Sequence, residues 1–416
     1  MNTILFLSGT TMNDALGAAG RAHRAMFEPF GYKFIEINLS EPGADATLGR
    51  VMQAERVEFV YGVMGMGADI GGKTADGRDI NYWEGVGIPY ISLKGDTPAY
   101  FFSRHVMTSP WHACLYFFPE HLEVRKRFRP TRALYGIVPP IPFDMTDKRQ
   151  IDFRKKEVGK LLFLKNGNDP EKLVRTWRDG MPEPTFLALS ELASELASGL
   201  DTRIGDDIDA LVVAYFRTRG WDVEEFVTLR LFFVAQLDDY LRRIKSALIA
   251  DVLADFPVEI HGFNWEHMDF SRRKATYVQG GDYTATRQRI VDSLAIVDMS
   301  PNTQRAPHDR AMRAFGLYTL CVTNRQSFFS ENFTNADDFT YRFDREHLRA
   351  RIADVLADPK GSVELGIDAA EQFRKERRPS DFAQFMIDTA SHVRLACSSR
   401  PAGFQDYFVW PPARFS

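Results

Sequence analysis

The chain has 416 residues, of which 44% are hydrophobic and 26% charged, and its formal net charge is −4. This composition is that of a soluble globular protein, and the length allows two domains with separate hydrophobic cores. The small negative charge excludes a strong electrostatic attraction to nucleic acid or to an anionic membrane surface.

The first residues and the cysteines indicate a cytoplasmic protein. The sequence MNTILFLSGTT begins with a short apolar run that no basic residues precede, which predicts a first β-strand and not a signal peptide. No apolar run approaches the roughly 20 residues needed to span a bilayer. Cys114, Cys321 and Cys397 lie far apart and form no CxxC motif, so we expect neither a disulfide framework nor a zinc site.

The N-terminal part alternates short apolar runs with helix-like segments such as residues 13–30. The runs predicted as strands are ILFLSG, YKFIEINL, VEFVYGV, GIPYISLK, ACLYFF and ALYGIV. Strands separated by about 15–25 residues with amphipathic stretches between them favour right-handed βαβ crossovers and a parallel sheet. We therefore predict a Rossmann-like domain over residues 1–144, which ends at the proline-rich linker VPPIPFD.

A second Rossmann-like domain is predicted over residues 145–395. Its strands are KLLFLKNGN, FPVEIHGF, ATYVQGG, SLAIVDMS, LYTLCVTN and DFTYRFD. Residues 171–253 carry apolar positions three and four apart, which predicts a helical insertion with one packed face, and that face offers a surface for pairing with a second copy. Helices are expected at 346–356 and 381–393, and the aromatic tail 396–416 is expected to pack back on the domains.

Two Rossmann-like domains predict an α/β protein with a cleft at the carboxyl ends of both sheets, where open α/β sheets bind ligands. The glycines of GVMGMGADIGG, residues 62–72, lack the spacing of a dinucleotide fingerprint. We interpret this segment as a flexible loop at the cleft, and a nicotinamide cofactor is not expected.

Residues 300–316, SPNTQRAPHDRAMRAFG, join the end of an apolar strand to the start of a helix in which Pro307 suits the first turn. The free N–H groups of such a helix start favour an anion such as a diphosphate. Arg305, in the loop before the helix, suits a forked contact with phosphate oxygens. Phosphates would repel Asp309, so we expect it to bind sugar hydroxyls. The same residue types are also ordinary turn and cap residues, and that interpretation stays open.

This segment resembles the donor site of GT-B glycosyltransferases of the CgeB-like, glycosyltransferase-4-related group. In that group a strand ends in Asn/Ser-Pro-Asn, an Arg and a Glu-Arg pair follow, and a later strand precedes an acidic-aromatic element. Here SPN, Asp309-Arg310 and the pair of Glu331 and Phe333 stand at those places.

Two upstream stretches extend the resemblance. DYLRRIKSALIADVLADFPVEIHGFNW resembles an Arg-rich helix that leads to a strand ending in Gly and Trp, and GIPYISLKGDTPAYF is similar to a strand followed by Asp-x-Pro. The resemblance implies a GT-B fold and a hexosyltransferase that moves a sugar from a nucleotide-diphosphate sugar to a glycan, protein or small-molecule acceptor. The donor contacts that we predict are Lys165, Asn166, Gly262, Trp265, Ser300, Asn302, Arg305, His308, Asp309 and Glu331.

One position departs from the group's pattern. Where related enzymes often carry a Glu in the donor helix that holds the nucleotide ribose, this chain has Arg313, and Tyr318 replaces a small residue further on. The resemblance therefore does not supply a ribose-binding carboxylate at that place. Asp309 and Glu331 are the alternatives.

The acceptor side is predicted on the N-terminal domain. Asp96 follows a strand and precedes a Pro, a position from which a general base can reach an acceptor hydroxyl, although Asp is also a common cap. The loop of Gly9, Thr10 and Thr11 allows a close backbone approach to the acceptor. His105, expected about two turns further along a helix after Asp96, is assigned to the acceptor site with a structural role as the alternative.

The predicted catalytic residues are Asp96 and Asp309. No Asp-x-Asp motif occurs in a metal-holding context, and a helix N-terminus with Arg305 can neutralise a diphosphate leaving group, so we predict that no metal and no further cofactor are required. Two alternatives stay open because fold does not fix function. One is a nucleotide-sugar epimerase or hydrolase on the same fold, and the other is a non-catalytic partner subunit that binds nucleotide sugar.

Overall fold

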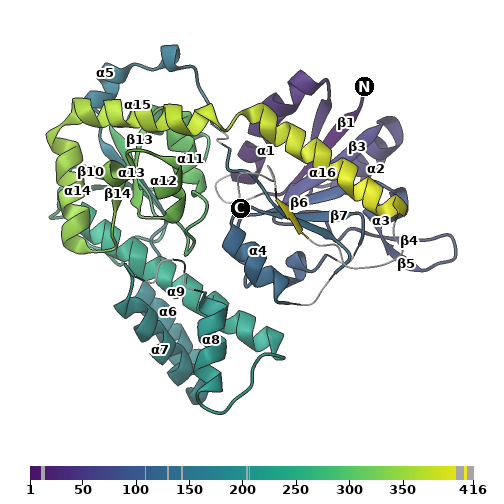
Figure 1. Cartoon of the computed structure of the whole chain (residues 1–416), viewed down its shortest axis with the longest axis horizontal. Helices are drawn as coiled ribbons and strands as arrows, with labels where there is room; N and C mark the ends of the chain where they lie inside the picture. The colour runs from purple at the N-terminus through teal and green to yellow at the C-terminus, as the bar shows by residue number, and fades with distance from the viewer. Residues whose placement is uncertain are drawn as a thin grey trace. The chain divides into compact units, whose positions relative to one another are not determined.

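The chain divides into two compact units, Met1–Phe143 with Arg377–Ser416 (unit 1) and Asp144–Glu376 (unit 2). The first boundary falls at the predicted proline-rich linker. The second corrects the sequence analysis, which kept the chain in the second domain as far as residue 395. The computed structural model describes residues 1–10, 15–107, 109–128, 131–141, 144–202, 205, 207–399 and 407–409 (Figure 1).

Unit 1 contains a parallel sheet with the strand order β15-β8-β7-β6-β3-β1-β2. The strands are β1 (Thr3–Ser8), β2 (Lys33–Asn38), β3 (Val57–Val63), β6 (Tyr90–Lys94), β7 (His112–Tyr116), β8 (Leu134–Ile137) and β15 (Tyr407–Val409). The first six match the predicted apolar runs to within one residue at their starts, because a parallel sheet is covered on both faces and its strands are rich in apolar residues. β2 and β3 flank β1 on opposite sides, so the carboxyl ends of β1 and β3 form a topological switch point.

Helix α16 completes the core of unit 1. It lies beside α1 (Figure 1), and its buried side chains Phe382, Phe385 and Met386 pack in one cluster with Phe6 and Tyr61 of the sheet. The helices of unit 1 are α1 (Ala15–Phe27), α2 (Ala44–Ala54), α3 (Tyr82–Val86), α4 (Pro119–Lys126) and α16 (Pro379–Ser399), with the 3-10 turns η1 (Glu28–Phe30) and η2 (Phe102–His105). From the tail, Tyr407–Val409 pairs with β8, in keeping with a tail that returns to the sheet.

The segment that we interpreted as a flexible loop contains regular structure. After a turn, β4 (Gly71–Lys73) pairs antiparallel with β5 (Asp79–Asn81). The hairpin turn is closed by a hydrogen bond from the Gly77 N–H to the Thr74 carbonyl, at 2.9 Å. Gly77 has φ +82, a conformation that glycine adopts at little cost.

Unit 2 contains a second parallel sheet with the order β11-β10-β9-β12-β13-β14. Its strands are β9 (Leu161–Leu164), β10 (Val258–Gly262), β11 (Thr276–Gln279), β12 (Ala295–Val297), β13 (Leu320–Asn324) and β14 (Thr340–Tyr341). Since β10 and β12 flank β9 on opposite sides, the switch point lies at the carboxyl ends of β9 and β12. The remaining elements are η3 (Lys148–Gln150), α5 (Phe153–Glu157), α10 (Ala285–Asp292), α11 (Asp309–Gly316), α12 (Ser327–Asn332), α13 (Ala336–Phe339), α14 (Arg345–Ala357) and α15 (Pro359–Lys375).

The predicted helical insertion consists of α6 (Pro170–Gly180), α7 (Glu183–Ser198), α8 (Ile208–Arg217) and α9 (Val227–Leu253). Figure 1 shows α6, α7 and α8 alongside α9, which also contacts α14 at the sheet. The apolar side chains Leu231, Val234, Leu237 and Leu241 of α9 are each at most 5% exposed within the unit. These side chains are therefore covered within unit 2, whereas Leu187, Trp221 and Phe226 of the insertion are exposed, and pairing with a second copy stays a prediction.

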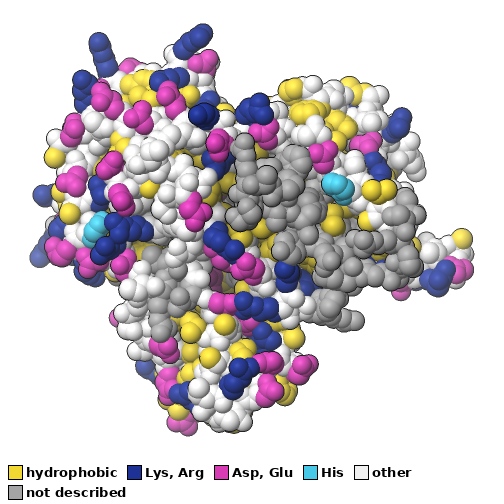
Figure 2. All heavy atoms as spheres, viewed as in Figure 1, with side chains coloured by type: hydrophobic (Ala, Val, Ile, Leu, Met, Phe, Trp, Pro, Cys, Tyr) yellow, Lys and Arg dark blue, Asp and Glu magenta, His cyan; other side chains and the backbone are white. Residues whose placement is uncertain are grey.

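Charges of both signs are interspersed on the face of the molecule drawn in Figure 2, as the small net charge predicts. Among the described helices, none combines the length and the apolar character needed to cross a membrane.

Candidate functional site

The ends of β9 and β12 meet at the switch point of unit 2. Lys165 and Asn166 directly follow β9, at the carboxyl edge where the sequence placed them. Asn166 is exposed, and its Oδ1 accepts a hydrogen bond of 3.0 Å from the backbone N–H of Phe263, so it ties this loop to the one after β10. Asp298 directly follows β12 on the neighbouring strand.

Lys165 holds an uncommitted positive charge at this edge. Its side chain is half-buried, and its ammonium group makes no hydrogen bond or ion pair with any residue that the structure describes. Burial lowers the pKa of Lys165 to about 7, and the nearby charges of Arg310 and Arg242 act in the same direction. Asp298 and Asp309 oppose this shift. A half-buried ammonium among other cations is well suited to an anionic ligand, which would restore its pKa.

Asp298 and Arg310 form a buried ion pair beside Lys165. Asp298 is 0% exposed, and its Oδ1 accepts a hydrogen bond of 2.7 Å from Arg310 Nε. Arg310 also donates to the carbonyl of Met299 at 3.1 Å. The second carboxylate oxygen, Asp298 Oδ2, is buried and has no hydrogen-bond partner within the described ranges. Such a group is expensive to leave unpaired, so it marks a place for a donor from a ligand.

Helix α11 points its N-terminus at the same edge. His308 is its N-cap, with Nδ1 accepting from the Arg310 N–H at 3.4 Å, and the helix begins at Asp309. Pro307 therefore lies before the cap and not in the first helical turn. Although burial works to raise the pKa of Asp309, the charges of His308, Arg310 and Arg313 outweigh it and hold that pKa below its ordinary value. The Asp309 side chain is 38% exposed, but its Oδ1 is buried against His308 Nδ1, so the ionised carboxylate is only partly open to solvent.

Ser300 and Asn302 shape the loop before α11 and do not present free polar groups. Ser300 is 1% exposed, and its N–H donates to Asn324 Oδ1 at 2.8 Å. The Asn302 amide is engaged at both ends by α9: Nδ2 donates to Asp238 Oδ1 at 2.7 Å, and Oδ1 accepts from Lys245 Nζ at 2.6 Å. The predicted direct contacts of both residues with an anion are therefore replaced by a role in holding the loop.

Gly262 and Trp265 both lie against the backbone carbonyl of Lys165. Gly262 has φ +156, and a Cβ at this position would lie 2.1 Å from the Lys165 carbonyl oxygen, so glycine is required for the close approach. Trp265 is 1% exposed and donates from Nε1 to the same carbonyl at 2.7 Å. Its ring is closed to a ligand, which corrects its prediction as a direct donor contact.

Arg305 and Glu331 are both exposed, in the loop before α11 and on α12 respectively. Phe328 and Phe329 of α12 are buried in the core, which fixes the position of that helix. The roles of Arg305 and Glu331 at a donor stay predictions.

Arg313 has a structural role that explains the departure from the group's pattern. It is 2% exposed, and its Nε pairs with Asp144 Oδ2 at 2.5 Å. Its terminal nitrogens donate to Thr286 Oγ1 and to the carbonyl of Tyr283, both at 3.0 Å, and its guanidinium lies 3.8 Å from the centre of the Tyr283 ring. With all its nitrogens engaged, Arg313 anchors α11 to the start of α10.

In unit 1, Gly9 and Thr10 lie at the switch point. A Cβ at Gly9 would lie 2.8 Å from Met66 Cε, and the exposed Thr10 donates its N–H to Ser40 Oγ at 3.0 Å. Thr11 lies outside the described residues. Asp96 follows β6 as predicted and is half-buried.

His105 belongs to the core of unit 1. It lies on the 3-10 turn η2 and not on a long helix after Asp96, because the chain turns at Thr97–Tyr100, where the Tyr100 N–H donates to the Thr97 carbonyl at 3.0 Å. It is 0% exposed, and its Nδ1 is 2.9 Å from the Tyr116 hydroxyl. Burial, reinforced by the charge of Lys94, lowers the pKa of His105 to about 2. The ring is neutral and closed to an acceptor, so the structure supports the structural alternative.

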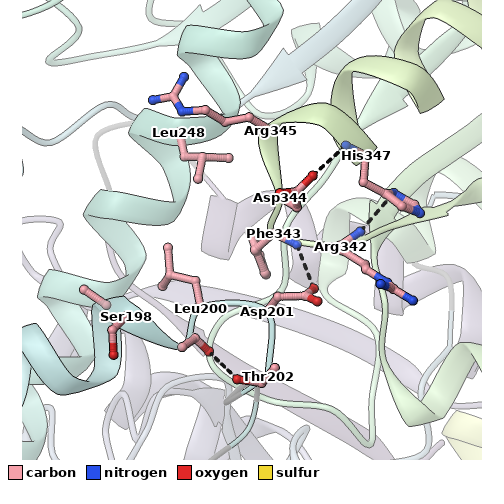
Figure 3. A pocket seen from close by; sticks show the side chains of 12 residues that line it. Ser198, Leu200, Asp201, Thr202, Leu248, Arg342, Phe343, Asp344, Arg345 and His347 are labelled. Carbon is pink, nitrogen blue, oxygen red and sulfur yellow. Dashed lines mark hydrogen bonds between the residues drawn. The ribbon is translucent and has the colours of Figure 1, made fainter.

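A cavity of about 600 Å³ lies at another place in unit 2, between the α7–α8 connection, α9 and the β14–α14 loop (Figure 3). Its carboxylates already accept backbone hydrogen bonds, Asp201 from Phe343 at 3.0 Å and Asp344 from His347 at 2.8 Å. None of the predicted site residues lines it. Within the described ranges, no group of three or more His, Cys, Asp or Glu side chains is arranged to hold a metal ion.

No protein-family model matches the chain, and no curated protein sequence is similar to it. Among solved structures, sucrose-phosphate synthase from Thermosynechococcus elongatus superposes with a TM-score of 0.51 at 9% identity, covering 96% of this chain and 100% of that one. An α-glucosyltransferase in complex with UDP superposes with a TM-score of 0.50 at 8% identity, covering 94% and 100%. The chain has a GT-B fold. At these identities the likeness establishes the fold alone.

In this GT-B fold, Lys165 lies at the carboxyl edge as predicted, whereas Asp298, Arg310 and Arg242, whose charges act on it, are not among the predicted donor contacts. Asp298 could have been found, because it directly follows an apolar strand run. Arg310 was noted only as part of a motif. Arg242 lies on a helix far away in the sequence, and only its spacing of four residues from Asp238 hints at a shared face.

Proposed function

We propose that this chain is a glycosyltransferase that moves a sugar from a nucleotide-diphosphate sugar to an acceptor hydroxyl, with the donor bound at the β9–β12 switch point. The observation that carries the proposal is the uncommitted ammonium of Lys165, beside the N-terminus of α11. The solved structures of the same fold support it, since one is a sucrose-phosphate synthase and the other an α-glucosyltransferase with UDP bound.

The charges at this edge suit a diphosphate. Lys165 and Arg310 bring positive charge to the carboxyl ends of β9 and β12, and the first N–H groups of α11 add the positive end of a helix dipole. A diphosphate bound there would raise the pKa of Lys165 and keep it protonated. The same groups would stabilise the diphosphate as it leaves the sugar, so we propose that transfer needs no metal ion.

Two carboxylates beside these cations suit hydroxyl groups. Asp309 is ionised and partly exposed at the start of α11, and Asp298 carries the buried, unpartnered Oδ2. Ionised carboxylates accept hydrogen bonds and repel phosphate, so we assign them to hydroxyls of the ribose or of the transferred sugar. Asp309 then acts on the sugar as the sequence analysis proposed.

We place the acceptor on unit 1, at the carboxyl edge of its sheet. Gly9 and Thr10 lie at the switch point, and Asp96 follows a strand of the same edge. In this proposal Asp96 takes the proton of the acceptor hydroxyl as general base. A cytoplasmic location and membership of the CgeB-like group complete the proposal.

Calorimetric titration of the protein with UDP, GDP and ADP tests the donor site, and mass analysis of reactions with a panel of nucleotide sugars tests the chemistry. We expect binding of one nucleoside diphosphate and an increase in acceptor mass by one hexose. Release of free sugar without acceptor would identify a hydrolase, and a changed sugar still attached to the nucleotide would identify an epimerase. Binding without any product would indicate a partner subunit, and no binding would refute the donor site.

A further inference from the structure

The cavity in unit 2 that lies away from the β9–β12 switch point is lined by three separate parts of the chain (Figure 3). Residues 197–202, at the end of α7 and after it, form one side, and Leu248 of α9 forms a second. Residues 342–345 and His347, from the β14–α14 connection and α14, form the third. The volume of about 600 Å³ is that of a small-molecule site. The helical insertion and the end of the sheet therefore meet around a space that can hold a ligand.

Backbone hydrogen bonds fix the polar side chains of this lining. Asp201 accepts from the Phe343 N–H at 3.0 Å and Asp344 from the His347 N–H at 2.8 Å, each through Oδ1. The first of these bonds joins the segment after α7 to the β14–α14 connection (Figure 3). The Oδ2 atom of each carboxylate has no hydrogen-bond partner among the described residues. Two oriented acceptors are thus left for a ligand.

Arg342 is a cation of the lining that has no partner. Its side chain is exposed, and its guanidinium makes no hydrogen bond or ion pair with a described residue. Arg345, by contrast, is paired with Asp251 of α9. On the neighbouring strand end Arg325 lies 3.4 Å from Asp337. Arg342 therefore offers its N–H donors at the surface of the cavity, in a planar fork.

His347 supplies a second donor. Burial lowers its pKa, and the charges of Arg325, Arg351 and Arg342 act in the same direction, so the ring is neutral at pH 7. Since Nδ1 accepts from the Arg342 N–H at 3.4 Å, the ring proton is assigned to Nε2. Nε2 has no hydrogen-bond partner among the described residues. The lining thus combines donors from two residues with acceptors from two others.

The charges of the described lining residues cancel, because two are cationic and two anionic: Arg342, Arg345, Asp201 and Asp344. A phosphate group here would meet the two carboxylates, and an ammonium group would meet the two guanidinium groups. A neutral ligand with several hydroxyl groups can use both kinds of side chain, since a hydroxyl donates to a carboxylate and accepts from a guanidinium. Leu200 and Leu248 add apolar surface for the C–H groups of such a ligand.

We propose that this cavity is a binding site for a neutral saccharide, with Arg342 and His347 as hydrogen-bond donors and Asp201 and Asp344 as acceptors. Lys165, which carries the proposed donor site, does not line it. The saccharide site is therefore separate from the switch point, and it holds whether or not the chain transfers sugars. A saccharide bound here contacts the insertion and the β14–α14 connection together, so binding should raise the thermal stability of the protein.

Calorimetric titration with maltose and N-acetylglucosamine tests the inference on the wild type, on Arg342→Gln and on a matched control, Arg349→Gln. Arg349 lies on α14, is paired with Asp255 at 2.7 Å and does not line the cavity. We expect a saccharide to bind, Arg342→Gln to weaken it about tenfold through the loss of a charge-assisted hydrogen bond, and Arg349→Gln to change affinity less than about twofold. Equal affinities in the two variants, or no binding of either saccharide to the wild type, would overturn the inference.

Asp201→Asn tests the acceptor side with the attachment of the insertion kept. The amide oxygen can still accept from the Phe343 N–H, while the free carboxylate oxygen becomes a donor. The variant should bind the same saccharide several-fold more weakly with an unchanged thermal unfolding temperature in the absence of ligand. Unchanged saccharide affinity would contradict the assignment of Asp201.

Inorganic phosphate and UDP complete the test. Phosphate binding that Arg342→Gln abolishes, in a protein that binds neither saccharide, would identify an anion site and refute a saccharide site. Arg342→Gln should leave UDP affinity unchanged, and a loss of UDP affinity would show that the two sites are not separate. UDP titration of the wild type decides the glycosyltransferase proposal on its own, whatever the saccharide titrations give.

Discussion

Each of the two sheets carries a lysine at its carboxyl edge. One ammonium group has a hydrogen-bond partner within its own unit, and the other has none among the described residues. Lys94, the last residue of β6 in unit 1, is 0% exposed and donates to the Arg104 carbonyl at 2.6 Å. Lys165, the first residue after β9 in unit 2, is half-buried and uncommitted. Burial lowers the pKa of Lys94 to about 8 and that of Lys165 to about 7.

Depressed pKa values alone therefore do not separate a structural lysine from a binding one. The difference lies in the partner: a carbonyl satisfies Lys94 within its own unit, whereas Lys165 lies within electrostatic reach of Asp298, whose Oδ2 also lacks a hydrogen-bond partner among the described residues. Unmatched polar groups of both signs at a switch point are the stronger indication of a ligand site.

The largest effect on the transfer rate is expected from substitution of Asp96. This substitution tests whether the carboxyl edge of the unit 1 sheet contributes to the reaction. Asp96→Asn removes the proposed general base, so transfer should slow by about 10²-fold or more, while UDP affinity on unit 2 stays unchanged. Product formation followed by mass spectrometry and UDP calorimetry on the same variant measure the two effects. A transfer rate within about threefold of wild type would remove Asp96 from the mechanism.

The paired substitutions Lys165→Met and Lys94→Met test the comparison directly. Lys165→Met should weaken UDP binding about tenfold or more, because the complex loses a charge-assisted contact, and should leave thermal stability nearly unchanged. Lys94→Met should leave UDP affinity unchanged and lower the free energy of unfolding, by about 1–3 kcal/mol, because the Arg104 carbonyl loses its donor. Calorimetry and thermal unfolding of both variants decide, and a reversed pattern would contradict the assignment.

A smaller effect is expected from pH. The ammonium form of Lys165 attracts the diphosphate, and its pKa of about 7 in the free protein means that this form is depleted as pH rises above that value. UDP affinity should therefore fall several-fold between about pH 7 and pH 9, with proton uptake on binding. The charges of Arg310, Arg242, Asp298 and Asp309 act on this group. Calorimetry in buffers of different ionisation enthalpy measures the uptake, and Lys165→Met should show none.

The sheets of both units could be predicted from the sequence because buried parallel strands are continuous apolar runs. The hairpin β4–β5 could not, since its short strands GGK and DIN have neither an apolar run nor an alternating pattern. Helix α16 was predicted as a helix, but the spacing of Phe382 and Met386 shows only that one face is buried and not which sheet covers it.

The candidate site was predictable in place and less so in detail. Strand ends and a helix start are local features, so the positions of Lys165, His308 and Asp309 at this edge could be predicted from the sequence, while their roles stay predictions. The observed roles of Ser300 and Asn302 depend on partners from β13 and α9, which local patterns do not reveal. The same holds for Arg313, whose partner Asp144 stands 169 residues away.

The return of the chain to unit 1 has a consequence for synthesis. Unit 2 is one continuous stretch, Asp144–Glu376, whereas the core of unit 1 needs α16, which follows that whole stretch. On the ribosome, the strands translated first must therefore wait for Phe382, Phe385 and Met386 before their sheet is covered, while unit 2 can already fold. A fragment that stops before α16 would leave that apolar surface exposed, and it is the kind of nascent chain that chaperones protect.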